Sequence, residues 1–465
     1  MPDLISLYSG LLAFLWEARW FIALAFVVLI THELSALSNA VRIHAVLMSV
    51  TIFLVITSYW ILKPIKKGLF LSHYKAHTFS FAGADYTAAQ VELLAKEVNV
   101  VLAIIAAIIF SALSRRYTRE HFYVALIAAF AFAFMLFAMV GDFTSVASIW
   151  LFYLSGDLFV TMLVAGFYAF LNDSEMPGSA KRLYGLIGLG GTMGGVVGSS
   201  MVAGHAKGLT PQLGLLYAAV LTVIMVVPVL LAGRIVRQDP PLIRTPPDAE
   251  PRFYGKWSRF FNGLDVVTRS RYLMGIAAIV GIYEIVSTLI DYQFSATIVH
   301  FVEGPKLGDA FAQVFTVTNL VAVAVQLILT RRILTRFGIG PALALLPFAI
   351  LLGSLGYMLM PVLLFGALLN TFDNGLAYSL NQSAKEVLYV PVSPGDKYRA
   401  KAFIDIFVLR TAKGLAVLLS IAVSFWFASF EDIRWLSLWV VMLLALWLFI
   451  VFHLSRAYAR REAMA

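Results

Sequence analysis

Long apolar segments recur from one end of this chain to the other, and they limit its fold more than any other feature. A helix needs roughly 20 apolar residues to cross the hydrocarbon core of a bilayer, which is about 30 Å thick. Only 13% of the 465 residues are charged, against about 25% in an average soluble domain. We therefore predict an all-α, multi-pass membrane protein embedded in the lipid bilayer. The twelve expected spans are residues 43–66, 92–113, 121–140, 146–170, 183–204, 212–233, 272–297, 309–330, 340–360, 361–382, 401–427 and 435–453.

A polar segment, RQDPPLIRTPPDAEPRFYGKWSRF, separates the sixth span from the seventh. Its prolines and mixed charges are typical of a solvated linker. The expected organisation is therefore an N-terminal helix region (1–41), an N-terminal six-helix bundle (42–235), a cytoplasmic linker (236–270), a C-terminal six-helix bundle (271–455) and a cytoplasmic tail (456–465).

Lysine and arginine placement predicts the orientation of the spans. The even-numbered spans lead into the basic segments RRYTRE, SAKR, RIVR, TRRILTR, DKYRAK and SRAYARR, whereas the opposite loops hold few basic residues. Basic loops stay in the cytoplasm, so both termini of the twelve-helix core are expected there. These loops also account for the net charge of +9, which therefore does not indicate nucleic-acid binding.

The N-terminal segment Leu11–Thr31 is apolar, but Glu17 and Arg19 interrupt it. We favour an interfacial helix there over a thirteenth span, because an even number of spans already satisfies the orientation. The first residues carry no basic region or small-residue cleavage site, so we expect no signal peptide.

The two halves of the chain resemble each other at matched positions. Arg115-Arg116 follow the second span and Arg331-Arg332 follow the eighth, while Lys181 and Lys401 stand before the fifth and eleventh. Gly194 then corresponds to Gly414. Two six-helix halves in parallel order are typical of the major facilitator architecture, in which substrate binds between the halves near the bilayer midplane. We therefore predict a twelve-helix, two-bundle fold of that type, with an extra N-terminal helix.

Charged residues inside membrane helices are costly, and they usually face a bundle interior or a watery cavity. A candidate site should therefore draw on the charged residues within the expected spans. The charged residues that we select from the spans and their ends are Lys63, Lys66, Lys67, Asp157, Glu284, Asp291, Asp373, Asp405, Arg410 and Lys413.

Three lysines stand at the end of the first expected span, in SYWILKPIKKGLFL. Lys63 and Lys67 share a helix face, and Lys66 points about 100° away from Lys67. They could extend to the lipid headgroups as an anchor, or face a negatively charged group inside the protein. Three lysines within five residues, directly after Tyr59 and Trp60, exceed what an anchor requires.

Glu284 and Asp291 lie seven residues apart on one face of the seventh span, where they could couple protons or form structural ion pairs. The glycine-rich segment at 185–195 lacks the GK[ST] ending and the preceding strand of a phosphate loop. Its small residues four apart instead favour close helix packing. We expect no metal site, no cofactor and no catalytic residues, because no ligand or nucleophile–base grouping emerges and the chain has no cysteine.

The segment YSLNQSAKEVLYVPVSPGDKYRAKAFIDIF (378–407) resembles the nucleotide transporter family, the ATP/ADP translocases of plastids and obligate intracellular bacteria. SAKRLYGLIGLGG (179–191) is similar to the family's fifth helix, ILKPIKKGL (61–69) to the end of its first, and STLIDYQFSA (287–296) to its acidic seventh-helix motif. The resemblance runs in order from about residue 42 to 455. Lys67 stands where the family usually has aspartate, and Asp291 where translocases tend to have glutamate.

This resemblance implies a membrane-embedded carrier that exchanges ATP for ADP or imports nucleotides with protons. It places the family's transport lysines and carboxylates on Lys66, on Asp291, on Asp157, and on Lys385 or Lys401. Because free-living bacteria have such relatives, we expect a bacterial inner-membrane protein, with a monomer as the default state.

We predict a secondary transporter of an anionic, nucleotide-like or phosphorylated solute. Lys66 and Lys67, with Lys63 beside them, would bind its negative groups with support from Arg410 or Lys413, and Tyr59, Trp60 or Tyr292 would stack a base. Asp291 or Glu284 would couple protons or balance the lysines when the site is empty. The alternatives are a proton-coupled carrier of another solute, such as a siderophore or lipid-like anion, and a non-transporting membrane scaffold or sensor.

Overall fold

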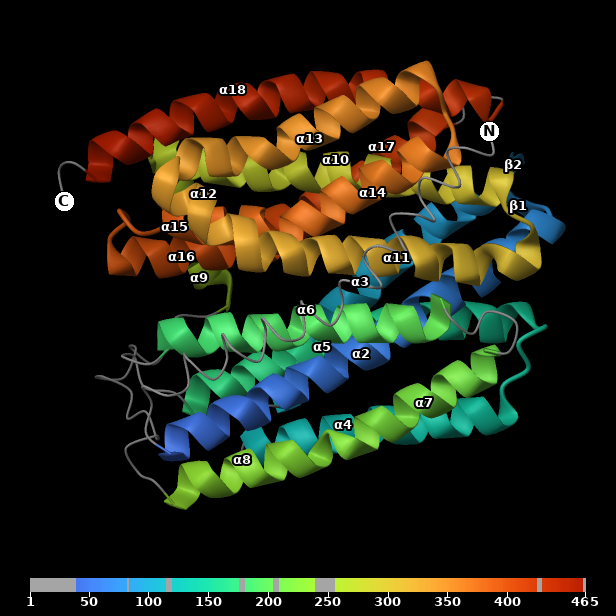
Figure 1. The fold of residues 1–465 in the computed structure, drawn as a ribbon, viewed down its shortest axis with the longest axis horizontal. Coiled ribbons are helices and arrows are strands. Elements are labelled where there is room, and N and C mark those ends of the chain that lie inside the picture. Colours follow the sequence, from blue (N-terminus) through green and yellow to red (C-terminus); the bar gives the residue numbers. More distant parts are fainter. Residues whose placement is uncertain are drawn as a thin grey trace. The chain divides into compact units, whose positions relative to one another are not determined.

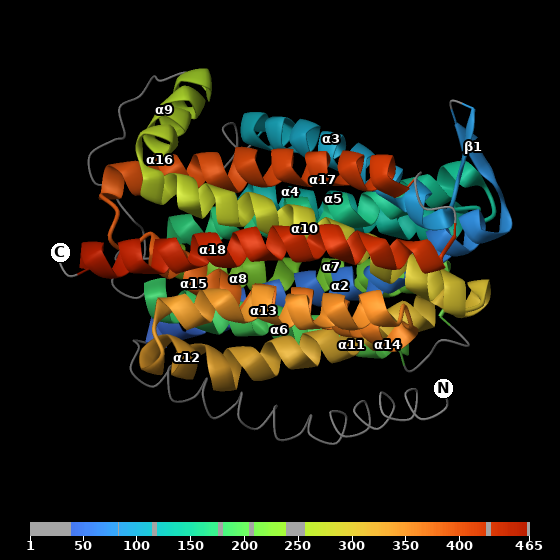
Figure 2. The ribbon, with the colours of Figure 1, turned by 90° about the horizontal axis from the view of Figure 1, so that it is seen from above.

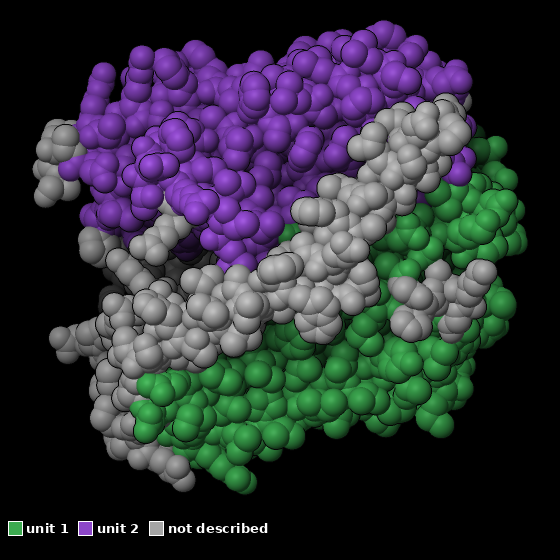
Figure 3. All heavy atoms as spheres, viewed as in Figure 1, with its two compact units in different colours: residues 1–88, 98–247, 302–320 green, residues 89–97, 248–301, 321–465 purple. Residues whose placement is uncertain are grey.

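The computed structural model describes residues 39–81, 83–113, 119–174, 180–203, 209–238, 256–424 and 429–462. The predicted N-terminal helix at 11–31 and much of the predicted linker lie outside these residues. The chain forms two compact units (Figure 3). Unit 1 comprises residues 1–88, 98–247 and 302–320, and unit 2 comprises residues 89–97, 248–301 and 321–465.

Unit 1 is built around α2 (Asn39–Ala76), which packs on α5 (Val146–Ser174), α6 (Ala180–Ala203), α7 (Pro211–Ile224) and α8 (Val226–Gln238). Figure 1 shows these helices side by side, with α4 (Arg119–Val140) against α7 and α5. Helix α7 ends at Ile224 because Pro228, four residues later, has no N–H to donate to the Ile224 carbonyl.

Unit 2 is built around α10 (Arg271–Phe301), which packs on α14 (Leu363–Leu376), α17 (Leu409–Ser424) and α18 (Leu436–Glu462). Figure 2 shows α10 running alongside α17 and α18. The other helices of the unit are α9 (Lys256–Arg269), α12 (Arg331–Arg336), α13 (Ile339–Leu359), α15 (Gln382–Leu388) and α16 (Pro394–Phe403). Helical turns of the π type lie at η3 (Val325–Thr330), η4 (Ala377–Asn381) and η5 (Ile404–Val408), and a 3-10 turn lies at η6 (Glu431–Trp435).

Two helices contribute to both units. Residues 89–97 of α3 (Ala88–Leu113) belong to unit 2, and residues 98–113 belong to unit 1. Residues 302–320, which include the 3-10 turn η2 (Gly304–Lys306) and most of α11 (Leu307–Ala324), belong to unit 1. Lys96 therefore lies among residues of unit 2, and Asn99, one turn later, among residues of unit 1.

A two-stranded hairpin follows α2. Strand β1 (Phe79–Phe81) pairs antiparallel with β2 (Ala84–Tyr86), with Phe79 opposite Tyr86. Gly83 in the turn has φ +82°, a left-handed conformation that glycine adopts without steric cost.

Each of the twelve predicted spans coincides with a helix or with a run of consecutive helices. Among the described residues, nine helical stretches are long and apolar enough to cross a membrane. The first boundary was wrong, because α2 continues to Ala76 rather than ending near residue 66. Pro64 does not end the helix, and the three lysines consequently lie inside it rather than at its end.

The glycine-rich segment packs against α2, as its small residues predicted. A Cβ atom at Gly190, Gly194 or Gly198 would lie 2.7, 2.5 or 2.4 Å from the carbonyl oxygens of Ser49, Phe53 and Thr57, respectively. Only glycine allows the two backbones to approach this closely. This contact holds α2 in place along α6, and α2 carries the lysines of the candidate site.

Candidate functional site

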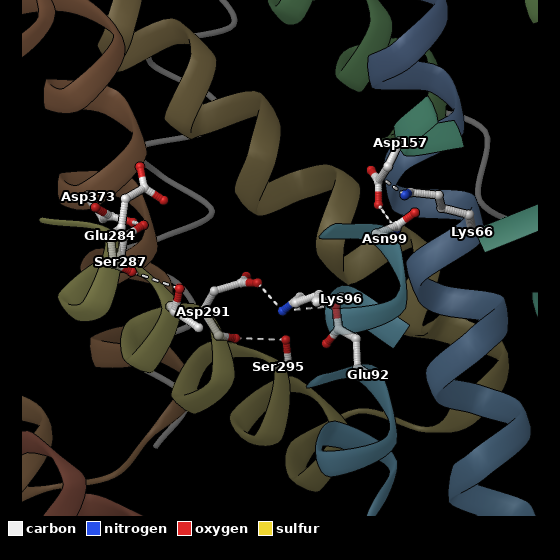
Figure 4. Close-up of polar contacts among 11 residues, drawn as sticks. Lys66, Glu92, Lys96, Asn99, Asp157, Glu284, Ser287, Asp291, Ser295 and Asp373 are labelled. Atoms are coloured by element: carbon white, nitrogen blue, oxygen red, sulfur yellow. Dashed lines mark hydrogen bonds and ion pairs between the residues drawn. The ribbon is translucent and has the colours of Figure 1, made fainter. Parts of the chain in front are cut away.

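The Lys66 side chain extends from α2 and is buried against α5. Its ammonium lies 2.5 Å from Asp157 Oδ1 and donates a hydrogen bond to the Tyr153 carbonyl oxygen at 3.0 Å. The nitrogen also lies 4.5 Å from the centroid of the Tyr153 ring. Asn99 donates to the other Asp157 oxygen at 2.6 Å (Figure 4). With the Lys66 side chain only 3% exposed, its charge is balanced by Asp157, one of the carboxylates that the sequence singled out.

The local sequence LSGDLF (154–159) on α5 allows Lys66 to be buried here. Tyr153 and Asp157 are four residues apart, so both face the same side of α5. A Cβ atom at Gly156 would lie 2.9 Å from Lys66 Cδ, so a side chain at this position would displace the lysine. The missing side chain leaves the space through which Lys66 reaches its two acceptors.

The other two lysines of α2 lie against aromatic rings of the same unit. The Lys63 ammonium lies 4.3 Å from the Trp60 ring centroid and 4.5 Å from that of Phe315. Lys67 is 4% exposed, and its ammonium lies 5.0 Å from the ring centroid of Phe311. A cation over a ring face is stabilised by the ring quadrupole. Both ammonium groups therefore lie beside aromatic rings of unit 1.

The aromatic residues predicted to stack a base are largely enclosed. Trp60 is 7% exposed and packs edge-on against Phe315, and Tyr292 is 3% exposed in the core of unit 2. Tyr59 is partly exposed, and its ring lies 5.9 Å from the Lys63 ammonium. Of the three, Tyr59 alone presents appreciable surface in this structure.

In unit 2 a polar stripe runs along α10. Glu284, Ser287, Asp291 and Ser295 recur at spacings of three and four residues, so they share one helix face. Asp291 forms an ion pair with Lys96, whose ammonium also lies 3.4 Å from Glu92 (Figure 4). In the middle of the stripe, Ser287 donates to the buried Asp373 carboxylate at 2.6 Å.

Lys96, Glu92 and Asn99 are site residues that the sequence analysis missed. Lys96 lies within α3 and within the second predicted span, yet it was not among the charged residues selected from the spans. A signal was present, because AAQVELLAKEVN carries glutamate and lysine four apart in an otherwise apolar helix. Three ionisable groups at the start of a membrane span indicate polar surroundings rather than lipid.

Three cations lie near Glu284. Lys413, Lys385 and Arg410, from α17 and α15, are its electrostatic neighbours. Among the described residues, Glu284 has no basic nitrogen within 4.0 Å, so none of the three cations forms an ion pair with it. Asp405 and Glu386 are further electrostatic neighbours of Lys385, so cations and carboxylates alternate in this part of unit 2, and within the described part of the chain the three cations form no ion pair with Glu284.

The family resemblance left open whether Lys385 or Lys401 is the transport lysine, and in the structure these two lysines have different surroundings. The Lys401 ammonium lies 2.7 Å from each oxygen of the Glu386 carboxylate, so its charge is locally balanced. Lys385 lies in the Glu284 cluster instead, with its ammonium 5.7 Å from the Tyr283 ring centroid. Lys385 is therefore the better candidate for contact with an anion.

Two π turns flank the Glu284 cluster. η4 ends at Asn381, four residues before Lys385, and η5 ends at Val408, two residues before Arg410. Turns of this type are rare and occur often at functional sites, because the extra residue changes the direction of the side chains that follow. Here they set the direction of two of the three cations.

A model of the Major Facilitator Superfamily matches residues 48–384, more than two thirds of the chain. The chain belongs to this superfamily. A second model, described as TLC ATP/ADP transporter, matches residues 354–458 and includes the 378–407 segment on which the resemblance was based. The predicted resemblance to ATP/ADP translocases within the major facilitator fold is thereby confirmed.

Curated relatives of this superfamily member are distant. ADP,ATP carrier protein 1 of Chlamydia muridarum is 24% identical over 310 residues, covering 59% of this chain and 58% of the carrier. The plastidic ATP/ADP-transporter of Solanum tuberosum is 23% identical over 283 residues, covering 55% of this chain and 45% of the transporter. The chain thus matches only about half the length of these curated relatives.

Solved structures confirm the all-α, multi-pass major facilitator fold. The human organic anion transporter MFSD10 aligns with a TM-score of 0.59 and 17% identity, covering 89% of this chain and all of that one. A mutant of the nucleoside transporter NupG aligns with a TM-score of 0.57 and 14% identity, covering 90% of this chain and 99% of that one. At these identities the likeness concerns the fold.

Proposed function

We propose that this protein is a secondary active transporter of an anionic, nucleotide-like solute, working by alternating access between its two six-helix halves. The observation that carries this proposal is the cluster of three cations near Glu284, where Lys385, Arg410 and Lys413 form no ion pair among the described residues. A phosphate group is a ligand of matching charge, and Arg binds it through two parallel hydrogen bonds. The curated relatives, which are named as ATP/ADP carriers, support a nucleotide as that anion.

The lysines of α2 would supply a second anion-binding element. Lys66 is balanced by Asp157 in this structure, so a substrate phosphate would compete with that carboxylate for the ammonium. Asp157, Asp291 and Glu284 would in turn neutralise the cations whenever the carrier is empty. This division of roles supports either ATP/ADP exchange or proton-coupled uptake.

Uptake into liposomes tests the proposed function. Purified protein in vesicles loaded with ADP should take up labelled ATP with saturation. The Lys385→Gln and Arg410→Gln variants should raise KM about tenfold or more, because each removes a charged hydrogen-bond donor to phosphate. Lys401→Gln, whose ammonium is held by Glu386, is the matched control and should raise KM less.

Other outcomes separate the alternative functions. Uptake of another organic anion without uptake of nucleotides would identify a proton-coupled carrier of a different solute. If the protein shows neither uptake nor saturable nucleotide binding, the remaining alternative is a membrane scaffold or sensor.

The proposed location is the bacterial inner membrane, with both core termini and the linker in the cytoplasm, as the basic loops indicate. A single cysteine placed at Ala249 in the linker, outside the described residues, should resist an impermeant thiol reagent in intact spheroplasts and react after lysis. The natural chain has no cysteine to interfere. Labelling of intact spheroplasts would contradict this orientation.

A further inference from the structure

Asn381 is a buried amide that has no hydrogen-bond partner among the described residues. Its side chain is 1% exposed, and neither Nδ2 nor Oδ1 has a partner within the described part of the chain. A primary amide offers two donors and an acceptor, and burying all of them unpaired is costly. Native structures contain few such groups, and each one needs an explanation.

The position of Asn381 suggests the explanation. It is the last residue of η4 and lies four residues before Lys385, so the two side chains share a helix face. Lys385 lies over the Tyr283 ring of α10 and beside Glu284. Tyr272, also on α10, donates to the Leu388 carbonyl oxygen at 2.6 Å, which joins the end of α15 to α10. The Asn381 amide therefore lies on the same face of η4 and α15 as Lys385, one of the three cations near Glu284.

We propose that Asn381 is a specificity residue that binds the edge of the solute's nucleobase and selects adenine. This inference rests on the proposed function and deepens it. An asparagine amide can accept a hydrogen bond from the adenine 6-amino group while donating one to N7. Guanine presents two acceptors at the same positions, O6 and N7, so the Asn381 carbonyl oxygen would face an acceptor.

The spacing on the helix suits a nucleotide. Asn381 lies about one helical turn from Lys385, so an amide that reads a base and a cation that binds phosphate are close neighbours on one face. The amide is enclosed in this structure. In carriers that work by alternating access, groups at the substrate site are closed in one state and open in another, so a base would complete the unmet hydrogen bonds on binding.

A structural role and a binding role for Asn381 predict opposite changes in stability. If the amide only supported the fold, its removal would lower the melting temperature. An unpaired buried amide costs free energy, so replacing it with leucine, a side chain of similar size, should leave the melting temperature unchanged or raise it. Sites that keep a destabilising group for function show this trade-off between stability and activity.

Binding of three probes to the purified full-length protein tests the proposal. Wild type should bind ATP more tightly than GTP, and Asn381→Leu should weaken ATP binding about tenfold and erase the preference. The same variant should bind inorganic tripolyphosphate with unchanged affinity, because the cations that hold phosphate remain. Asn374→Leu is the matched control, since Asn374 lies on α14 just before η4 and its amide already donates to the Asn370 carbonyl oxygen at 3.1 Å. It should keep the ATP preference.

The possible results either support the proposal or overturn it. An unchanged ratio of ATP to GTP affinity in Asn381→Leu would overturn it, as would a lowered melting temperature with equal loss of ATP and tripolyphosphate binding. If wild type binds tripolyphosphate but does not distinguish ATP from GTP, the anion site stands and the base-reading role of Asn381 fails. If wild type binds none of the probes, the proposed function fails as well.

Discussion

Replacing Lys66 with glutamine is expected to abolish high-affinity uptake while leaving expression and folding near normal. The ammonium contributes a charged hydrogen bond to a bound phosphate, and the loss of such a bond weakens binding by about 1.5–3 kcal/mol, or roughly tenfold to a hundredfold in KM. Folding should tolerate the change because Asp157 is 31% exposed and keeps its hydrogen bond from Asn99. Uptake kinetics in liposomes and thermal melting of the same preparation measure the two effects separately.

Two further variants show which property of Lys66 matters. Lys66→Gln combined with Asp157→Asn removes both charges of the pair, so any instability caused by an unbalanced carboxylate should disappear while uptake stays low. Lys63→Gln loses the contacts of the ammonium with the Trp60 and Phe315 rings and should affect uptake less. Wild-type transport by both Lys66→Gln and Lys67→Gln would return the three lysines to a purely structural or anchoring role.

Replacing Asp291 with asparagine is expected to reduce turnover at least tenfold. This change removes one of the two carboxylates that balance Lys96 and leaves Glu92 at 3.4 Å as its remaining partner. A partly buried cation that has lost a partner resists the rearrangement of its helix, because its charge must stay solvated or paired. In a proton-coupled carrier the variant should no longer respond to the proton gradient, whereas equilibrating exchange survives. In a pure exchanger, turnover should fall with the pH dependence unchanged.

The double variant Asp291→Asn with Lys96→Gln is the control for charge balance. Removing both partners leaves no unpaired charge between them, so stability should recover relative to Lys96→Gln, which leaves two carboxylates, Asp291 and Glu92, without their shared cation. Melting temperatures of the single and double variants, together with uptake at two pH values, measure this coupling. If Asp291→Asn alters neither turnover nor the pH response, Asp291 is structural and Glu284 becomes the coupling candidate.

The length and spacing of the apolar segments were enough to predict the fold. Each predicted span coincides with a helix or a run of helices because the bilayer sets the length of apolar chain that a span requires. The glycines of α6 were equally informative, because small residues four apart usually allow two membrane helices to pack closely. Helix boundaries near charges were less predictable. The first span was predicted to end near residue 66. In the structure, α2 continues to Ala76, and Lys66 is buried against Asp157.

The sequence by itself determined the membrane class and most of the charged residues available inside the helices, because these depend on composition and on spacing along one helix. Only the tertiary structure decided how those charges are paired. Lys96 meets Asp291 across 195 residues of chain, and Lys401 is balanced by Glu386 while Lys385 joins Glu284. Such pairings depend on how each helix is rotated against its neighbours, and π turns such as η4 and η5 shift that rotation by one residue. Spacing along a single helix carries no information about the rotation of the helix beside it.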